Sequence, residues 1–234
     1  MKTKKTTKIV KENKIKKEMN FKEFKNKDGK HFRVAIFGSS KIEEGDIIYK
    51  RVKDLAEMLG EEGIDVVTGG GSGLMRAANT GHKIGSDKSG SNAHSIGIGI
   101  HLPWNQKFNE AVDYKEKKNR FSKRLDEFML MSNAVVVTPG GIGTMLELFY
   151  TWQLVQVHHI CDIPIILMGE QWGPLLKWIK KDPLVKGYLT EQDFNLVFHA
   201  KNTKQAIEII DEAYKHFKAG GKDFCLNYEK YRSK

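Results

Sequence analysis

The residues best placed to do chemistry lie between positions 135 and 147, which read VVVTPGGIGTMLE. A run of β-branched residues, typical of a buried strand, ends at a Pro-Gly-Gly turn, and a helix is predicted to follow. A glycine turn at a helix start lets the backbone approach an anion, and the free N–H groups there attract negative charge. We therefore predict phosphate binding by Gly140, Gly141, Gly143 and Thr144.

Glu147 is the only charged residue between positions 144 and 157. The rest of this predicted helix is mostly apolar, which indicates burial on most sides. Two interpretations of the carboxylate are open. With Thr144 it matches a capping box, in which a glutamate reaches back to the helix start. Alternatively it lies beside a phosphate and binds ribose hydroxyls, orients water or stabilises positive charge on a sugar carbon.

A second glycine-rich turn, GGGSGLM at 69–75, follows another predicted strand. It lacks the third glycine of the dinucleotide fingerprint and the Gly-Lys-Ser/Thr of a Walker A loop. We predict that it contacts phosphate, and that Ser39, which follows the first predicted strand, adds a hydroxyl. Simple turns or helix caps are the alternative for both segments. The predicted contacts in the second turn are Gly71, Ser72, Gly73 and Met75.

Arg124 is the candidate counter-charge, because a guanidinium binds phosphate or carboxylate through two parallel hydrogen bonds. A solvated arginine on a helix surface is the alternative. His101, His158 and His159 show neither an acidic partner nor ligand spacing, which favours surface or hydrogen-bonded core histidines over general bases. The sequence shows no Ser/His/Asp signature and no metal-ligand motif, so we expect no metal.

Predicted strands alternate with predicted helices, a pattern typical of a single α/β domain whose parallel sheet carries helices on both faces. The carboxyl ends of parallel strands share one edge, where ligands bind, so the turns near Ser39, Gly71, Asn105 and Gly141 should meet. The strands are predicted at 32–37, 64–68, 95–102, 135–138, 162–168 and 195–199, the helices at 45–60, 74–84, 116–131, 144–157, 173–179 and 203–217, and irregular segments at 85–94 and 105–114.

The net charge of +10 is concentrated at the amino terminus. Residues 1–30 hold twelve lysines and four acidic residues, a charge of +8, which leaves about +2 for the rest. A basic arm on a nearly neutral body is more typical of a solvated extension, with a helix over 8–24 an option, than of a nucleic-acid reader. We divide the chain into a basic extension at 1–30, a folded domain at 31–220 and a tail at 221–234.

The location predicted from the sequence is the cytoplasm. No apolar run reaches transmembrane length, and the basic amino terminus lacks the apolar core of a secretory signal. Cys161 and Cys225 lie far apart and form no metal-spaced cluster, which suits a reducing compartment.

Residues 139–147 match PGGxGTxxE, a hallmark of the LONELY GUY family of nucleoside 5′-monophosphate phosphoribohydrolases, which includes cytokinin-activating enzymes. The second glycine turn resembles the family's GGG…GLM turn, and Arg124 lies at the usual distance before the PGG turn. The segment 102–109 resembles an LPxEQxxN element of a bacterial branch. The resemblance covers roughly residues 31–200. Two positions depart from it: Leu125 replaces a lysine, and Asn105 replaces a glutamate.

This resemblance implies a Rossmann-like three-layer fold and a dimer or larger assembly, with the active site near the subunit interface. It implies hydrolysis of the N-glycosidic bond of a nucleoside 5′-monophosphate, AMP or an N6-substituted AMP, without a metal or organic cofactor. Arg124 and Glu147 match the family's catalytic pair, and Asn105 and Gln106 are candidate substrate contacts. Family members were long labelled lysine decarboxylases, but no motif here would seat pyridoxal phosphate.

Two competing functions remain open at this point. The same rim could hold a nucleotide or phosphorylated cofactor without cleaving it, an alternative that Asn105 and Leu125 favour. A weaker hypothesis is nucleic-acid association through the lysine-rich arm.

Overall fold

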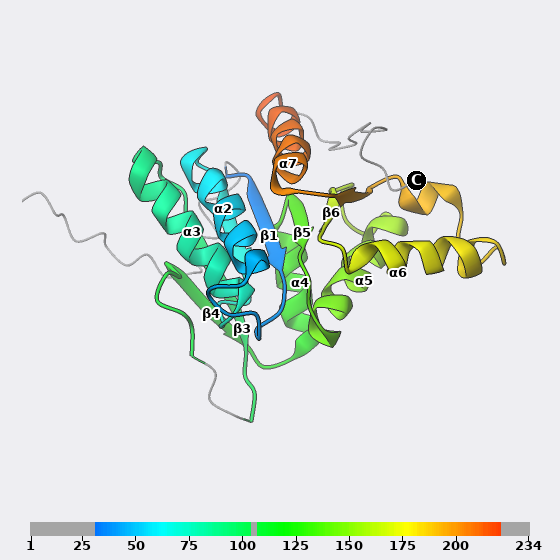
Figure 1. The fold of residues 1–234 in the computed structure, drawn as a ribbon, viewed down its shortest axis with the longest axis horizontal. Coiled ribbons are helices and arrows are strands. Elements are labelled where there is room, and N and C mark those ends of the chain that lie inside the picture. The colour runs from blue at the N-terminus through cyan, green and yellow to red at the C-terminus, as the bar shows by residue number, and fades with distance from the viewer. Residues whose placement is uncertain (1–30, 104–106, 221–234) are drawn as a thin grey trace, which may run out of the picture.

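The computed structural model describes residues 31–103 and 107–220 and shows one seven-stranded sheet in the order β4-β3-β2-β1-β5-β6-β7 (Figure 1). Every neighbouring pair of strands is parallel, as predicted. The strands are β1 (Arg33–Phe37), β2 (Asp65–Thr68), β3 (Ser95–Ile100), β4 (Tyr114–Lys118), β5 (Ala134–Val137), β6 (Ile165–Met168) and β7 (Val197–Ala200). The helices are α2 (Ile47–Glu61), α3 (Leu74–Ser89), α4 (Phe121–Met131), α5 (Ile142–Gln156), α6 (Trp172–Ile179), η1 (Lys180–Leu184), η2 (Glu191–Phe194) and α7 (Thr203–Lys218).

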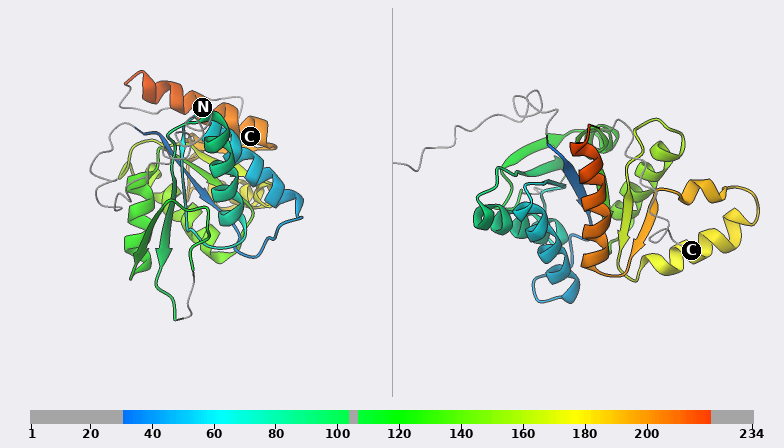
Figure 2. Two further views of the ribbon diagram at one scale, coloured as in Figure 1. Left: turned by 90° about the vertical axis from the view of Figure 1, so that its left-hand side faces the viewer. Right: turned by 90° about the horizontal axis from the view of Figure 1, so that it is seen from above.

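Helices cover both faces of the sheet, which confirms the predicted three-layer α/β architecture (Figure 2). Side chains along β1 point alternately to the two faces of the sheet, and each face has its own hydrophobic core. Val34 and Ile36 pack with α2, α3 and α7, whereas Ala35 and Phe37 pack with α4, α5 and α6. The buried strands read as near-continuous apolar runs because both of their faces are covered.

The order of the strands reverses between β1 and β5. From β1 the chain moves outward through β2 and β3 to β4, then returns to place β5 on the other side of β1. In open parallel sheets a crevice forms outside the carboxyl ends of the strands at such a reversal. Here the turns after β1 and β5 lie in contact: the N–H of Ser39 donates to the C=O of Pro139 at 3.0 Å.

Two sequence predictions about elements were wrong. Residues 114–118, predicted as the end of a loop and the start of a helix, form β4, and α4 begins only at Phe121. This edge strand reads YKEKK and is only partly buried, so it lacks the apolar run that marks the other strands. The predicted loop at 85–94 is helical to Ser89.

Close packing explains the error in α3. A Cβ on Gly81 would lie 2.0 Å from the C=O oxygen of Lys53, and one on Gly85 would lie 1.9 Å from that of Glu57. These glycines therefore let α3 pack against α2 and do not end the helix. The helix ends at Gly90, which has a φ of 67°.

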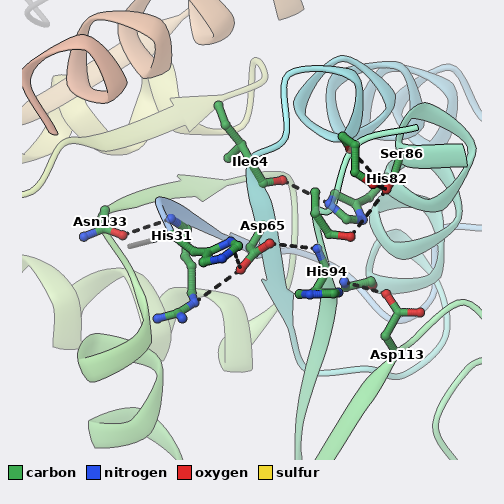
Figure 3. A network of polar contacts seen from close by, with 12 residues as sticks. His31, Ile64, Asp65, His82, Ser86, His94, Asp113 and Asn133 are labelled. Atoms are coloured by element: carbon green, nitrogen blue, oxygen red, sulfur yellow. Dashed lines mark hydrogen bonds and ion pairs between the residues drawn. The ribbon is translucent and has the colours of Figure 1, made fainter. Parts of the chain in front are cut away.

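Polar residues gather at the amino edge of the sheet, around the fully buried carboxylate of Asp65 (Figure 3). Asp65 accepts a 2.7 Å hydrogen bond from the N–H of His94 and forms ion pairs with Arg33 at 3.5 Å and His31 at 3.7 Å. Burial raises the pKa of Asp65 to about 6, although the His94 N–H and the two basic side chains lower it. The N–H of Arg33 donates to Asn133, which ties β1 to the segment before β5.

Several predictions lie outside the described residues: the helix at 8–24, the tail at 221–234, and the positions of Asn105 and Gln106. Within the described ranges, no helix has the length and apolar character needed to cross a membrane. The same ranges hold no group of three or more His, Cys, Asp or Glu side chains that could bind a metal ion.

Candidate active site

A cavity of about 540 Å³ opens at the carboxyl ends of β1 and its neighbours, where the strand order reverses. Its walls come from the turn after β1, the glycine-rich turn after β2, the end of β3 and the first turns of α4 and α5. It is lined by Ile36, Phe37, Gly38, Ser39, Ser40, Lys41, Gly69, Met75, Ile100, Leu102, Phe121, Arg124, Gly141, Ile142, Gly143, Thr144 and Glu147.

Arg124 and Glu147 meet in this cavity. The Nη1 of Arg124, on α4, donates to the Oε1 of Glu147, on α5, at 2.9 Å. The guanidinium is held from two further sides: its Nε donates to the C=O of Ile98 at 2.9 Å, and it lies 4.9 Å from the ring centroid of Phe128. Arg124 is therefore a fixed partner of the carboxylate, and the alternative of a solvated arginine was wrong.

The surroundings of Glu147 shift the pKa of its carboxyl group. The residue is only 8% exposed, and burial raises the pKa of its carboxyl group, while the nearby Arg124 opposes that shift. The capping-box interpretation was wrong: α5 begins at Ile142, Gly141 is its N-cap, and no side chain caps the helix. Glu147 is thus available for interactions inside the cavity.

The PGG turn brings the start of α5 to the same cavity. Gly141, Gly143 and Thr144 line it, and the N-terminal N–H groups of α5 have no capping side chain. Gly140 is placed differently from the other predicted phosphate contacts. Its N–H and its C=O both bond to the side chain of Gln171, and it is not among the residues that line the cavity.

The turn after β1 supplies the opposite wall. Ser39 lines the cavity, its Oγ accepts from the N–H of Lys41, and its C=O accepts from the N–H of Leu74. The sequence prediction missed Lys41, an exposed cation at the cavity mouth. A lysine directly after the Gly-Ser-Ser turn could have suggested it, but single surface lysines are too common to single out.

The second glycine-rich turn is divided between two cavities. Met75 lies in the cavity that contains Glu147, together with Gly69, whose Cα is so close to Arg124 that a Cβ would lie 2.6 Å from its Nη2. Gly71 and Ser72 instead line a neighbouring cavity of about 560 Å³.

Gly73 occupies a third environment. It is the N-cap of α3, with a φ of 66°, and a Cβ there would lie 2.3 Å from the C=O oxygen of Ser39. The structure thus brings together Arg124, Glu147, Ser39, Met75, Gly141, Gly143 and Thr144, but not Gly71, Ser72, Gly73 or Gly140.

The three histidines considered from the sequence are exposed, as expected. His158 lies 3.5 Å from Asp162, an ion pair that the sequence reasoning did not anticipate. None of the three lines the cavity, so the general base interpretation gains no support.

The family model described as "Possible lysine decarboxylase" matches residues 75–210, more than half of the chain. This segment contains both Arg124 and Glu147. The chain belongs to the LONELY GUY family. A LONELY GUY relative from rice (Oryza sativa subsp. japonica), named probable cytokinin riboside 5′-monophosphate phosphoribohydrolase LOGL2, is 28% identical over 186 residues, which cover 77% of this chain and 72% of the relative.

A second relative has a longer chain. The pyrimidine/purine nucleotide 5′-monophosphate nucleosidase of Escherichia coli (strain K12) is 28% identical over 146 residues, 59% of this chain. The match spans only 31% of the E. coli protein. Among solved structures, the molybdenum cofactor binding protein of Rippkaea orientalis is similar with a TM-score of 0.55 and 21% identity, over 80% of this chain and 99% of that one. At this identity the likeness shows that the LONELY GUY chain shares the fold.

Proposed function

We propose that this protein hydrolyses the N-glycosidic bond of a nucleoside 5′-monophosphate, AMP or an N6-substituted AMP, to a free base and ribose 5-phosphate. The observation that carries the proposal is the 2.9 Å pair of Arg124 and Glu147 in the cavity that also contains the start of α5. The names of the rice and E. coli relatives support the same reaction class.

The phosphate is assigned to the start of α5. The backbone N–H groups of Gly141, Gly143 and Thr144, together with the positive end of the helix, suit a dianion. Ser39 and the exposed Lys41 supply further polar contacts from the opposite wall. A phosphate fixed here places the attached ribose in the cavity, where Arg124 and Glu147 lie.

At the sugar, the bond from C1′ to the base nitrogen breaks, and its electron pair leaves with the base. The sugar ring gains oxocarbenium character, which the Glu147 carboxylate stabilises while it binds ribose hydroxyls. A water oxygen forms the new bond to C1′, and the proton that the water loses balances the proton that the departing base gains. Arg124 favours the ionised form of Glu147 and holds it in place, and offsets the charge of the phosphate.

The test is base release from a panel of nucleoside 5′-monophosphates, measured by chromatography, for the wild type and Glu147→Gln. A matched control is Glu127→Gln, because Glu127 is also buried in an ion pair, with Lys118 at 2.9 Å, but does not line the cavity. We expect release by the wild type and the control, and a loss of about a hundredfold or more in the Glu147 variant. Equal rates in the Glu147 variant and the wild type would refute the catalytic assignment.

The proposal includes a homodimer or a larger assembly formed through α5. Ile142, Leu146 and Phe149 are spaced along one face of this helix and are 83%, 45% and 43% exposed. Ile142 also lines the cavity, so a partner on this face would cover the site. Light scattering on the wild type and Leu146→Glu tests this, and a wild-type monomer at micromolar concentration would contradict it.

We further propose that the protein works in the cytoplasm. Cys161 is free and exposed, and a reducing compartment preserves such a thiol. Localisation of the full-length tagged chain by microscopy tests this placement.

One observation favours a second candidate, a nucleotide-binding protein that does not cleave its ligand. Leu125 replaces the lysine expected from the family pattern, and its side chain is buried in α4. Leu125 does not line the cavity, and it leaves Arg124 without the neighbouring positive charge that the family pattern has at this position. Tight binding of AMP without any base release would favour this second function over hydrolysis.

A further inference from the structure

The side chain of Gln171 makes two hydrogen bonds to one residue of the PGG turn. Its Nε2 donates to the C=O of Gly140 at 2.8 Å, and its Oε1 accepts from the N–H of Gly140 at 3.0 Å. Gln171 lies directly before α6 and is not among the residues that line the cavity. An amide from the connection between β6 and α6 thus satisfies both backbone polar groups of Gly140.

The same turn is fixed at its other residues. The C=O of Pro139 accepts from the N–H of Ser39 at 3.0 Å. Gly169, with a φ of 122°, packs so closely on Pro139 that a Cβ would lie 2.8 Å from the proline Cγ. Gly140 itself lies against Thr144, because a Cβ on Gly140 would come within 2.1 Å of the threonine Oγ1. The turn is held between the segments that follow β1 and β6.

This restraint matters because glycine does not restrain its own backbone. Gly140 and Gly141 have no Cβ, and Gly141 provides no capping side chain to the start of α5. Rotation at Gly140 would redirect the N–H groups that follow it, and a phosphate needs several such groups to converge. Both hydrogen bonds from Gln171 would break in that rotation.

We propose that Gln171 is a positioning residue for the phosphate site, which fixes Gly140 so that the N–H groups at the start of α5 converge on the phosphate of the ligand. The inference rests on the proposed function, since it assigns that phosphate to the same turn. Gln171 does not line the cavity, and its hydrogen bonds are to Gly140 and not to Arg124 or Glu147. Its loss therefore weakens binding of phosphate-bearing ligands and leaves the step at the sugar carbon largely unchanged.

The experiment compares the wild type with Gln171→Met, which keeps the length of the side chain but cannot form either hydrogen bond. Gln205→Met is the matched control, because Gln205 also bonds a backbone N–H, that of Lys201 at 2.8 Å, near the start of α7 and outside the cavity lining. Calorimetric titration with ribose 5-phosphate gives the affinity without any turnover. We expect the Kd to rise about tenfold in Gln171→Met and to stay unchanged in the control.

Two further readouts separate positioning from a general loss of structure. Binding of adenosine, which lacks the phosphate, should be unchanged in Gln171→Met, and in turnover of AMP the KM should rise while kcat stays within about twofold. If Gln171→Met does not fold, Gln171→Glu serves instead. It retains the acceptor for the Gly140 N–H but places an oxygen against the Gly140 C=O, so it too should weaken ribose 5-phosphate binding.

Failure of the inference about Gln171 can be told apart from failure of the proposed hydrolysis. A wild type that binds ribose 5-phosphate but releases no base refutes the hydrolysis, and the ratio of the Kd values still decides the role of Gln171. An unchanged Kd in a folded Gln171 variant, or an equal loss of adenosine binding, overturns the inference. A wild type that does not bind ribose 5-phosphate at millimolar concentration overturns it as well.

Discussion

The two edges of the sheet each bury an arginine beside a carboxylate, and the surroundings of the two pairs differ. At the amino edge, Asp65 is fully buried, and Arg33, His31 and the N–H of His94 surround its oxygens (Figure 3). At the carboxyl edge, Glu147 bonds to Arg124 but also faces a cavity of about 540 Å³. The same residue types thus join strands at one edge and remain accessible to a ligand at the other.

Because only one of the two pairs faces a cavity, a buried ion pair is not by itself a sign of function. Desolvation raises the pKa of both carboxylates, so the shift alone does not separate them. What distinguishes the Glu147 pair from the Asp65 pair is its surroundings. Only Glu147 faces the cavity and the uncapped start of α5, and only its arginine is held by Ile98 and Phe128. Substitutions at each edge should therefore affect different properties.

The largest expected effect is on activity at the carboxyl edge. Glu147→Gln should lower kcat/KM by about a hundredfold or more, because the neutral amide no longer stabilises positive charge on the sugar. Asp65→Asn should leave kcat/KM of the folded protein within about twofold. Steady-state kinetics on both variants, with circular dichroism to confirm folding, checks the contrast. A similar activity loss in both variants would remove the distinction between the edges.

Arg124→Met should change the pH dependence of what activity remains. Burial raises the pKa of Glu147, and loss of the guanidinium that opposes this shift should raise it further. The reaction needs the ionised carboxylate, so activity falls as pH drops through this pKa. The acidic limb of the kcat/KM profile should therefore lie at a higher pH than an ordinary glutamate would give, and at a still higher pH in Arg124→Met. An acidic limb at the same pH in both proteins would contradict the effect of Arg124 on the pKa of Glu147.

At the amino edge the expected effect is on stability. Asp65→Ala removes the acceptor of the His94 N–H and the oxygens that face the buried Arg33, and should lower the free energy of unfolding by about 2 kcal/mol at pH 7. Denaturant unfolding measures this, with Asp54→Ala as the control, since Asp54 forms an exposed pair with Lys50. No change in stability at Asp65 would argue against a structural role for its pair.

The pH dependence of that stability has a definite sign. The pKa of Asp65 is raised to about 6 in the folded protein, so the folded state keeps a proton that the unfolded state has already released. The wild type should therefore lose stability relative to Asp65→Asn as pH rises from about 4 to about 6. A stability difference that is constant over this range would contradict the shift.

The smallest effect is expected at the cavity mouth. Lys41→Ala removes an exposed cation and should raise the KM for AMP roughly threefold, less at high salt, because exposed charges are screened. Kinetics at two ionic strengths checks this, with Lys50→Ala, an exposed lysine of α2, as the control. A KM effect that is independent of salt would point to a direct structural role of Lys41.

Much of the carboxyl edge could be predicted from the sequence, because its signals are local. The apolar run before PGG indicates a buried strand, the turn residues indicate a helix start, and the isolated charge of Glu147 marks a position that needs a partner. The alternation of strands and helices then places the turns at one edge. The structure pairs this carboxylate with Arg124, and the catalytic role of the two residues stays a prediction.

The errors arose where one residue type serves two purposes. Gly85 marks a loop in the sequence but allows close helix packing in the structure. Gly71 and Ser72 precede Gly73, the left-handed N-cap of α3, and line a neighbouring cavity, so their contact with phosphate stays a prediction. Gln171 carries no local signal, because one side-chain amide bonded to a distant backbone depends on the arrangement of β5 and β6.

The most direct test of the account is the amount of free base released from AMP at a concentration that saturates binding, by the wild type and by Glu147→Gln. Saturation ensures that a difference reports the chemical step and not affinity. The account predicts steady release by the wild type and at most about one hundredth of that rate in the variant. Equal release by the two proteins, or bound AMP that stays intact in both, would contradict the assignment of Arg124 and Glu147 as a catalytic pair.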